Sequence, residues 1–366
     1  MNALVIGGTG PTGHFIVNGL RARGYAVAIL HTGNHEIDEI PDDVEHIHTD
    51  PFDRVAFEAA LGERRFDLCV ATYGRLRRIA AAMAGRCGRF LSVGGVPAYR
   101  GYMNPGLLTP AGLPVPTAEE APLVAVAEDD AKGFRIARTE AAVFEHHPTA
   151  AHFRYPYVYG PYQLVPREWC VVRRILDGRR QIVLPEDGLT LQHYGYVENL
   201  AHALLLAVDQ PEASAGQVYN CADEEVLTLR QVVEIVAACM GAELEIVSMP
   251  WRLAVPARPL MLQPLPTHRV LDLTKLKSEL GYRDIVPPRE GLRRTVEWLV
   301  AHRPAPGGTE ETVLQDPFDY AAEDALIERW QRALAGVRPP VFEREPGFTL
   351  SYSGPGGKAR STAGFE

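Results

Sequence analysis

A glycine-rich turn near the start of the chain separates an apolar segment from an amphipathic one. Residues 3–6 form a short apolar run, glycines follow at positions 7, 10 and 13, and apolar residues return at helical spacing from Phe15 onward. This order predicts a buried strand, a tight turn and a helix. Such glycines let the backbone approach a pyrophosphate, and the N–H groups at the helix start then face the anion. The stretch therefore predicts a dinucleotide site. A plain strand–loop–helix corner is the alternative, because the G-x-x-G-x-x-G spacing is looser than that of simple dehydrogenases.

Strand-like and helix-like segments alternate through the first 160 residues. Strands are expected at residues 3–6, 25–30, 44–48, 67–71, 89–93 and 151–155, with helices between most of them. This alternation predicts an α/β fold with a doubly wound, Rossmann-like parallel sheet. We expect a dinucleotide-binding domain over residues 1–160. A smaller α/β substrate lobe, interleaved with returning sheet elements, is expected over 161–300, and a linker, a helix and a mobile tail over 301–366.

Composition excludes several classes of protein. The net charge of −9 argues against a nucleic-acid surface, which would need a basic face. No apolar run is long enough to span a bilayer, so we expect neither membrane insertion nor a signal peptide, and a cytoplasmic location. The five cysteines are scattered and form no C-x-x-C pair, which predicts reduced thiols. No set of His, Asp and Glu has metal-ligand spacing along the chain, so no metal site is expected.

Further stretches of the first 300 residues carry a recognisable pattern. They are DPFD at 50–53, VATYG at 70–74, FLSVGGVPAY at 90–99, RYPYVYGP at 154–161, YVENLA at 196–201 and DLTK at 272–275. Together with the glycine turn, they resemble the extended short-chain dehydrogenase/reductase family, of the NAD-dependent epimerase and dehydratase type. The glycine turn and this resemblance together indicate a set of cofactor-binding residues. They are Gly7, Thr9, Gly10, Pro11, Thr12, Gly13, His31, Thr32, Asp50, Pro51, Ala71, Thr72, Tyr73, Arg75, Val93 and Tyr155.

The residues that transfer a proton in that family are replaced. The family uses a Ser or Thr with a Tyr and a Lys in Y-x-x-x-K, where the Lys and the cofactor lower the pKa of the Tyr. The resemblance places Gly95 at the Ser position, Lys132 at the Tyr position and Ile136 at the Lys position. A register shifted by two residues gives Phe134 and Arg138 instead, which still lacks a hydroxyl. An atypical active site is therefore expected.

Two residues are candidates for the missing acid or base. Tyr99 lies in the stretch that leads from the carboxyl edge of the sheet into the cleft, although a structural hydroxyl is an equal alternative. Lys132 becomes a usable acid or base if it is desolvated near the cofactor, whereas a surface charge is its ordinary role.

The cofactor form and the substrate are indicated by two further departures. An NAD site usually has an acid at the end of the second strand, where this chain has His31, so NADP is favoured and NAD is the alternative. Gln192 and His193 occupy the region where sugar-nucleotide enzymes of the family hold the diphosphate with a basic residue. A small organic or sugar-derived substrate is therefore expected, unless Arg167, Arg258 or Arg269 supplies that charge.

Three functions remain open at this point. The first is an NAD(P)-dependent oxidoreductase or epimerase-like enzyme with a non-standard proton-transfer site. The second is an enzyme that keeps its dinucleotide tightly bound and uses it within one cycle, for an epimerisation or an elimination. The third is a catalytically silent dinucleotide-binding sensor or partner-binding module. The resemblance also implies a homodimer paired through two helices of the first domain.

Overall fold

The computed structural model describes residues 1–72, 75–261, 263, 265–338 and 340–347. Within it the chain divides into two compact units, Met1–Phe318 and Asp319–Glu366. In the second unit the described regular element is α12 (Tyr320–Ala335), whose first turn is capped by Asp319. The divisions that the sequence suggests at residues 160 and 300 stay predictions, because both lie away from this boundary.

A parallel sheet of seven strands forms the centre of the first unit. In spatial order its strands are β11 (Val218–Asn220), β6 (Ala151–Tyr155), β5 (Cys87–Gly95), β4 (Phe66–Ala71), β1 (Asn2–Ile6), β2 (Ala26–His31) and β3 (Glu45–His48). The strand order reverses direction between β1 and β4, which is the point where such sheets bind ligands at their carboxyl edge. The predicted doubly wound α/β fold is thus confirmed.

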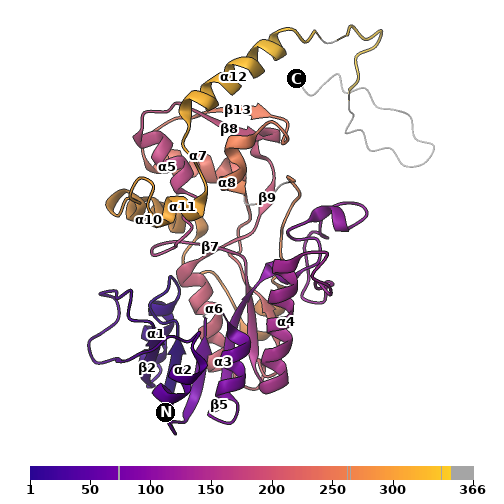
Figure 1. Cartoon of the computed structure of the whole chain (residues 1–366). Helices are drawn as coiled ribbons and strands as arrows, with labels where there is room; N and C mark the ends of the chain where they lie inside the picture. Colours follow the sequence, from indigo (N-terminus) through magenta and orange to yellow (C-terminus); the bar gives the residue numbers. More distant parts are fainter. Residues whose placement is uncertain (73–74, 262, 264, 339, 348–366) are drawn as a thin grey trace, which may run out of the picture. The chain divides into compact units, whose positions relative to one another are not determined.

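Helices cover both faces of this sheet. The helices are α1 (Gly13–Ala22), α2 (Arg54–Leu61), α3 (Leu76–Met83), α4 (Ala131–His146) and α6 (Val197–Asp209). One apolar core joins α1 and α6 to one face of the sheet, and a second core joins α2, α3 and α4 to the other face. Figure 1 shows α3 and α4 running side by side, and these two helices are in contact. Both faces of the sheet are therefore shielded from water, as a parallel sheet requires.

The remaining elements of the first unit are shorter. They are β7 (Tyr157–Tyr159) beside β10 (Tyr194–Tyr196), β8 (Gln181–Pro185) beside β13 (Glu245–Met249), β9 (Leu191–Gln192) beside β12 (Leu227–Thr228), and α5 (Trp169–Leu176), α7 (Leu229–Cys239), α8 (Arg258–Met261), α9 (Thr274–Leu280), α10 (Pro288–Ala301) and α11 (Thr309–Leu314). Single-turn 3-10 helices lie at Val96–Ala98, Pro105–Leu107, Glu186–Gly188 and Val255–Ala257. The proline-rich residues 100–127 contain no longer regular element, as their composition predicts.

Residues 309–316, which follow α10, are packed against α5. Glu311 of α11 accepts hydrogen bonds from the indole of Trp169 at 2.9 Å and from Arg173. Asp316 forms a buried ion pair with Arg174 of α5 at 2.6 Å. These contacts fasten residues 309–316 to the lobe.

All five cysteines are free thiols. None of the helices in the described part of the chain combines the length and the apolar character needed to cross a membrane.

Candidate active site

The glycine turn between β1 and α1 has the geometry of an anion site. Gly7 has a φ of 97°, a left-handed conformation that favours glycine. A Cβ on Gly13 would lie 2.3 Å from the carbonyl oxygen of Gly8, so this position needs glycine for close packing of helix on turn. A Cβ on Gly10 would meet nothing closer than Gly7 O at 3.6 Å, which leaves the outer side of the turn open. The Thr12 side chain caps none of the first N–H groups of α1. The N–H of Gly13 donates to the carbonyl oxygen of Gly10 at 2.8 Å, so the N–H groups of the residues that follow it remain available to a ligand.

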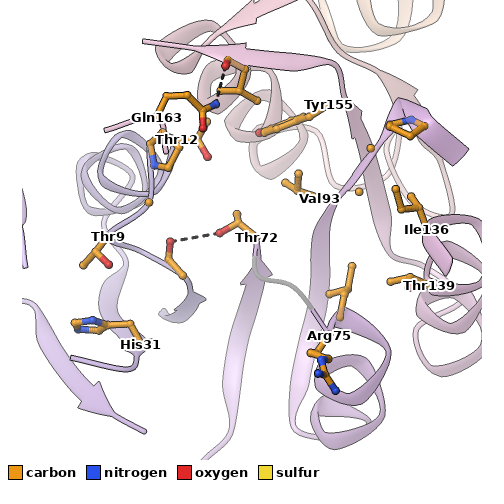
Figure 2. Close-up of a pocket in the computed structure, with 18 of the residues that line it drawn as sticks. Thr9, Thr12, His31, Thr72, Arg75, Val93, Ile136, Thr139, Tyr155 and Gln163 are labelled. Atoms are coloured by element: carbon orange, nitrogen blue, oxygen red, sulfur yellow. Dashed lines mark hydrogen bonds between the residues drawn. The ribbon is translucent and has the colours of Figure 1, made fainter. Parts of the chain in front are cut away.

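A cavity of about 830 Å³ opens in front of this turn. Its walls come from the carboxyl ends of β1, β2, β4, β5 and β6 and from one side of α4. Of the residues predicted to bind a cofactor, those that line it are Gly7, Thr9, Gly10, Pro11, Thr12, His31, Thr32, Thr72, Arg75, Val93 and Tyr155. Figure 2 shows His31 and Thr9 on one side of this space and Ile136 and Thr139 on the opposite side. The fold therefore brings most of the predicted set together.

The other predicted cofactor residues lie elsewhere. Gly13 is buried under the turn, and Ala71 is the fully buried last residue of β4. Asp50 and Pro51 follow β3, where Asp50 Oδ1 accepts the N–H of Phe52 at 2.8 Å, and neither lines the cavity. Tyr73 lies outside the described residues.

The end of the cavity near β2 is polar and carries cationic or protonatable groups. We call it the ribose end, after the part of a dinucleotide that binds there in Rossmann folds. It includes His31, His35 and Arg75. Arg75 is exposed at the start of α3, and its guanidinium lies 5.2 Å from the centre of the Phe52 ring. Among the described lining residues there is no carboxylate.

The opposite end, between β5, β6 and α4, is mainly apolar, and we call it the nicotinamide end. Val93, Pro97, Ile136 and Val158 form its walls. Tyr155 presents only its ring, since its hydroxyl donates to the carbonyl oxygen of Leu200 at 2.9 Å and burial raises the pKa of the phenol well above its usual value.

Tyr99 does not line the cavity. It is fully buried, its hydroxyl donates to Asn220 Oδ1 at 2.7 Å, and the same oxygen accepts from the Arg154 guanidinium at 2.7 Å. Burial raises the pKa of Tyr99 to about 12, which disfavours the phenolate. Arg154 is in turn held by two hydrogen bonds to Glu140 of α4, at 2.7 and 2.8 Å. These contacts fit the structural role that the sequence left open for Tyr99.

Lys132 is also outside the cavity. It is the exposed second residue of α4, and its backbone N–H donates to the N-cap Asp130 at 2.9 Å. One turn later, Ile136 does line the cavity. Neither Tyr99 nor Lys132 lines the cavity, so the structure gives no support to a catalytic role for either residue.

Sequence reasoning missed two polar residues on the same helix. Arg135 and Thr139 line the nicotinamide end beside Ile136, and Thr139 Oγ1 donates to the carbonyl oxygen of Arg135 at 2.7 Å. Helical spacing could have indicated Thr139, because residues three apart share a helix face and Ile136 was already placed at the family's Lys position, and Arg135 lies one turn before Thr139.

Comparison with sequence families finds one match. Residues 137–222 match the model of the NAD dependent epimerase/dehydratase family. This segment begins inside α4 and ends just after β11, so it holds Glu140, Arg154 and Tyr155 but not the glycine turn.

The curated proteins that are similar in sequence include the following two. Escherichia coli YbjS, described as an uncharacterized protein, is 28% identical over 170 residues, which are 41% of this chain and 49% of that protein. The 3-diazoavenalumate denitrifying reductase of a Streptomyces species is 27% identical over 317 residues, covering 80% of this chain and 100% of that protein. The chain thus spans about half the length of the first relative and the whole of the second.

A solved structure shares the fold. The UDP-glucose 4-epimerase of Thermus thermophilus, solved in complex with NAD, has a TM-score of 0.62 and 21% identity, covering 82% of this chain and 99% of that one. The seven-stranded sheet and the matched segment therefore lead to the same assignment. Over residues 137–222 the chain matches the NAD-dependent epimerase/dehydratase family model, and its fold is shared with a solved epimerase.

Proposed function

We propose that this protein is an NADP(H)-dependent reductase that delivers a hydride to a small organic acid without a proton from a family-type tyrosine. The observation that carries the proposal is the nicotinamide end of the cavity. There α4 contributes Ile136 where the family places its Lys, and Arg135 stands beside it. An apolar wall with one cation suits hydride transfer to an anionic substrate better than it suits proton abstraction from a sugar hydroxyl.

The residues present fit a dinucleotide. The open face of Gly10 and the uncapped start of α1 suit a pyrophosphate, and the cavity lies in the volume range of ligand sites. When bound, the cofactor would supply a hydride at the nicotinamide end. We assign NADP because the described lining includes Arg75 and His35 and contains no carboxylate that would repel a 2′-phosphate.

The chemistry needs no acid when the substrate carries a suitable leaving group. If the carbon that accepts the hydride bears a diazonium group, the new C–H bond forms as the C–N bond breaks, and N₂ leaves with the bonding electron pair. Charge and atoms then balance without a proton. The Streptomyces relative supports a diazonium substrate. It is named as a 3-diazoavenalumate denitrifying reductase, and it aligns with this chain over its whole length.

The arginine at the nicotinamide end would orient the acid. Arg135 is exposed and lines the cavity, and in the described structure its side chain has no acidic partner. A guanidinium in this position can hold a carboxylate with two hydrogen bonds. Nucleotide sugars are a poorer fit, since Arg167 and Arg269 are buried and donate to Gln192 and to the carbonyl oxygen of Tyr102.

The test is consumption of NADPH by the purified full chain. The substrate panel contains aryl diazonium carboxylates, aldehydes and ketones, and UDP- and dTDP-sugars. We expect NADPH oxidation with release of N₂ from the first class. Conversion of a nucleotide sugar without net NADPH oxidation would overturn the proposal in favour of a cofactor used within one cycle. If the protein binds the cofactor but turns over no class of substrate in the panel, the reductase proposal would be overturned in favour of a sensor.

A matched pair of variants tests the role of Arg135. Arg135→Ala should raise KM for a carboxylate substrate about tenfold or more, because a charge-assisted hydrogen bond contributes about 1.5–3 kcal/mol. Arg138→Ala, an exposed arginine on the same helix outside the cavity, should leave KM unchanged. Equal KM values in both variants would contradict the assignment.

A further inference from the structure

Three histidines and a glutamate meet where β2 and β3 end. His31 is the last residue of β2, and His46 and His48 belong to β3. The parallel register pairs His31 with His48 and Ile29 with His46, so the three imidazoles share one face of the sheet. Glu36 comes from the loop between the two strands. One nitrogen or oxygen atom from each of the four residues lies within 4.8 Å of the others.

Several separations between these atoms are close to those in a tetrahedral coordination shell. His48 Nε2 lies 3.1 Å from Glu36 Oε1, and His46 Nδ1 lies 3.2 Å from Glu36 Oε2. His31 Nε2 lies 3.2 Å from His46 Nδ1 and 3.6 Å from Glu36 Oε1. A tetrahedral ion with bonds of about 2.0–2.1 Å places neighbouring donor atoms about 3.3 Å apart. The contacts to Glu36 and the contact between His31 and His46 are close to this value, and the atoms of all four residues lie within 4.8 Å of one another.

We propose that His31, Glu36, His46 and His48 bind a divalent transition-metal ion of the Zn²⁺ class. Imidazole nitrogens with one carboxylate are a ligand set that Zn²⁺ and Co²⁺ accept in tetrahedral sites. Mg²⁺ and Ca²⁺ prefer shells made of oxygen, which three histidines do not supply. The separation of the four residues along the chain explains why their spacing gave no sign of a site.

The four ligands are not equivalent. The N–H of Gly33 lies 3.3 Å from His31 Nδ1, an arrangement that leaves the proton of the neutral ring on Nε2. His31 can bind the ion through Nε2 only after this proton has left Nε2 and the 3.3 Å contact between Gly33 N–H and Nδ1 has been lost. The side chains of His46 and His48 are 26% and 56% exposed and accessible from solvent. Glu36, His46 and His48 are thus the primary ligands, and His31 completes the shell.

An anion would be a poorer occupant of the same place. The Glu36 carboxylate lies within 3.6 Å of a ring nitrogen of all three histidines, so a phosphate at the centre of the group would meet a negative charge. Of the four residues in the cluster, His31 is the one that lines the dinucleotide cavity. The metal site does not depend on the proposed reductase activity, because its residues come from β2, β3 and the loop between them.

Metal titration of the full chain tests the proposal. Protein freed of metal with a chelator is titrated with Zn²⁺ by calorimetry and with Co²⁺ by visible absorption. We expect one ion per chain and the intense ligand-field bands of tetrahedral Co²⁺. Loss of a ligand should weaken binding at least as much as loss of a supporting residue does, about 10–100-fold. The double variant H46Q/H48Q should therefore lose more than about 100-fold in affinity, and His31→Gln should lose less.

A neighbouring histidine provides the matched control. His35 lies in the same loop as Glu36 but supplies no atom to the group. His35→Ala should bind one ion with unchanged affinity, and circular dichroism should show that every variant is folded. Undiminished binding by H46Q/H48Q, or an equal loss in His35→Ala, would overturn the proposal. A further pair of results would also overturn it. If the wild type binds no ion, and H46Q/H48Q loses affinity for NADP but not for NAD, the cluster binds the 2′-phosphate instead of a metal. Absence of reductase turnover leaves these titrations unaffected.

Discussion

The two ends of the cavity are built from different kinds of residue. The ribose end presents backbone N–H groups, His31 and Arg75 to a ligand, whereas the nicotinamide end presents Val93, Ile136 and the ring of Tyr155. The first has groups that can bind phosphate and ribose, and the second has few groups that can carry a proton. The difference teaches that the two ends of one cavity can offer a ligand distinct chemistry, polar groups at one end and a mainly apolar wall at the other. Each prediction below tests one side of that comparison.

The largest effect is expected from the glycine turn at the ribose end. Gly13→Ala would place a methyl group 2.3 Å from a backbone carbonyl that has little freedom to move. We expect the free energy of unfolding to fall by about 3 kcal/mol or more, with loss of dinucleotide binding. Gly10→Ala meets nothing closer than 3.6 Å, so its stability should change by less than about 1 kcal/mol while the methyl group blocks the pyrophosphate. Urea unfolding and NADPH fluorescence measure the two quantities, and equal destabilisation in both variants would contradict the distinction.

An intermediate effect is expected behind the nicotinamide end. Tyr99→Phe removes the hydroxyl that joins Asn220 to Arg154, so the free energy of unfolding should fall by about 1–3 kcal/mol. Because the pKa of Tyr99 is raised to about 12, its phenolate is scarce at neutral pH, and the pH–rate profile should not change. Lys132→Ala, on the exposed first turn of α4, should change neither stability nor rate. Loss of turnover in a folded Tyr99→Phe protein, with loss of one limb of the pH profile, would restore Tyr99 as the proton donor.

The smallest effect is expected at Arg75. Its exposed guanidinium should contribute about 1 kcal/mol to binding of a 2′-phosphate, so Arg75→Ala should weaken NADP binding about fivefold and leave NAD binding unchanged. Arg77→Ala, on the exposed side of α3 and outside the cavity, should affect neither cofactor. Fluorescence titration with both cofactors gives the ratio, and an equal loss for NAD and NADP in Arg75→Ala would remove the basis for selectivity.

The part of the site that could be predicted is the part that a local pattern specifies. The turn of Gly7, Gly10 and Gly13 depends on residues adjacent in sequence, and the alternation of strand and helix segments indicated the parallel sheet. The resemblance to the family placed Ile136 at the Lys position, and Ile136 lines the cavity in the structure. In the glycine turn and the sheet, patterns of neighbouring residues decide which residues meet.

The other parts of the site depend on the direction in which a side chain points and on the register between paired strands. Neither follows from a local sequence pattern. Tyr99 follows the strand that leads to the cavity, but the 3-10 turn Val96–Ala98 intervenes and the side chain points into the core toward Asn220. The histidine cluster arises because the register of β2 and β3 sets His31 opposite His48. A shift of one residue would send His46 and His48 to the other face of the sheet.

The buried pair of Arg174 and Asp316 sets a lower limit on the length of chain that can be studied in isolation. The fold shared with the solved epimerase covers 82% of the chain, and a designer of truncated proteins would be inclined to stop near the end of α10. That cut would remove Asp316 from Arg174 and Glu311 from Trp169, and so expose a surface of α5 that is covered in the full chain. The smallest fragment for expression and crystallisation therefore extends to Phe318, the last residue of the first compact unit.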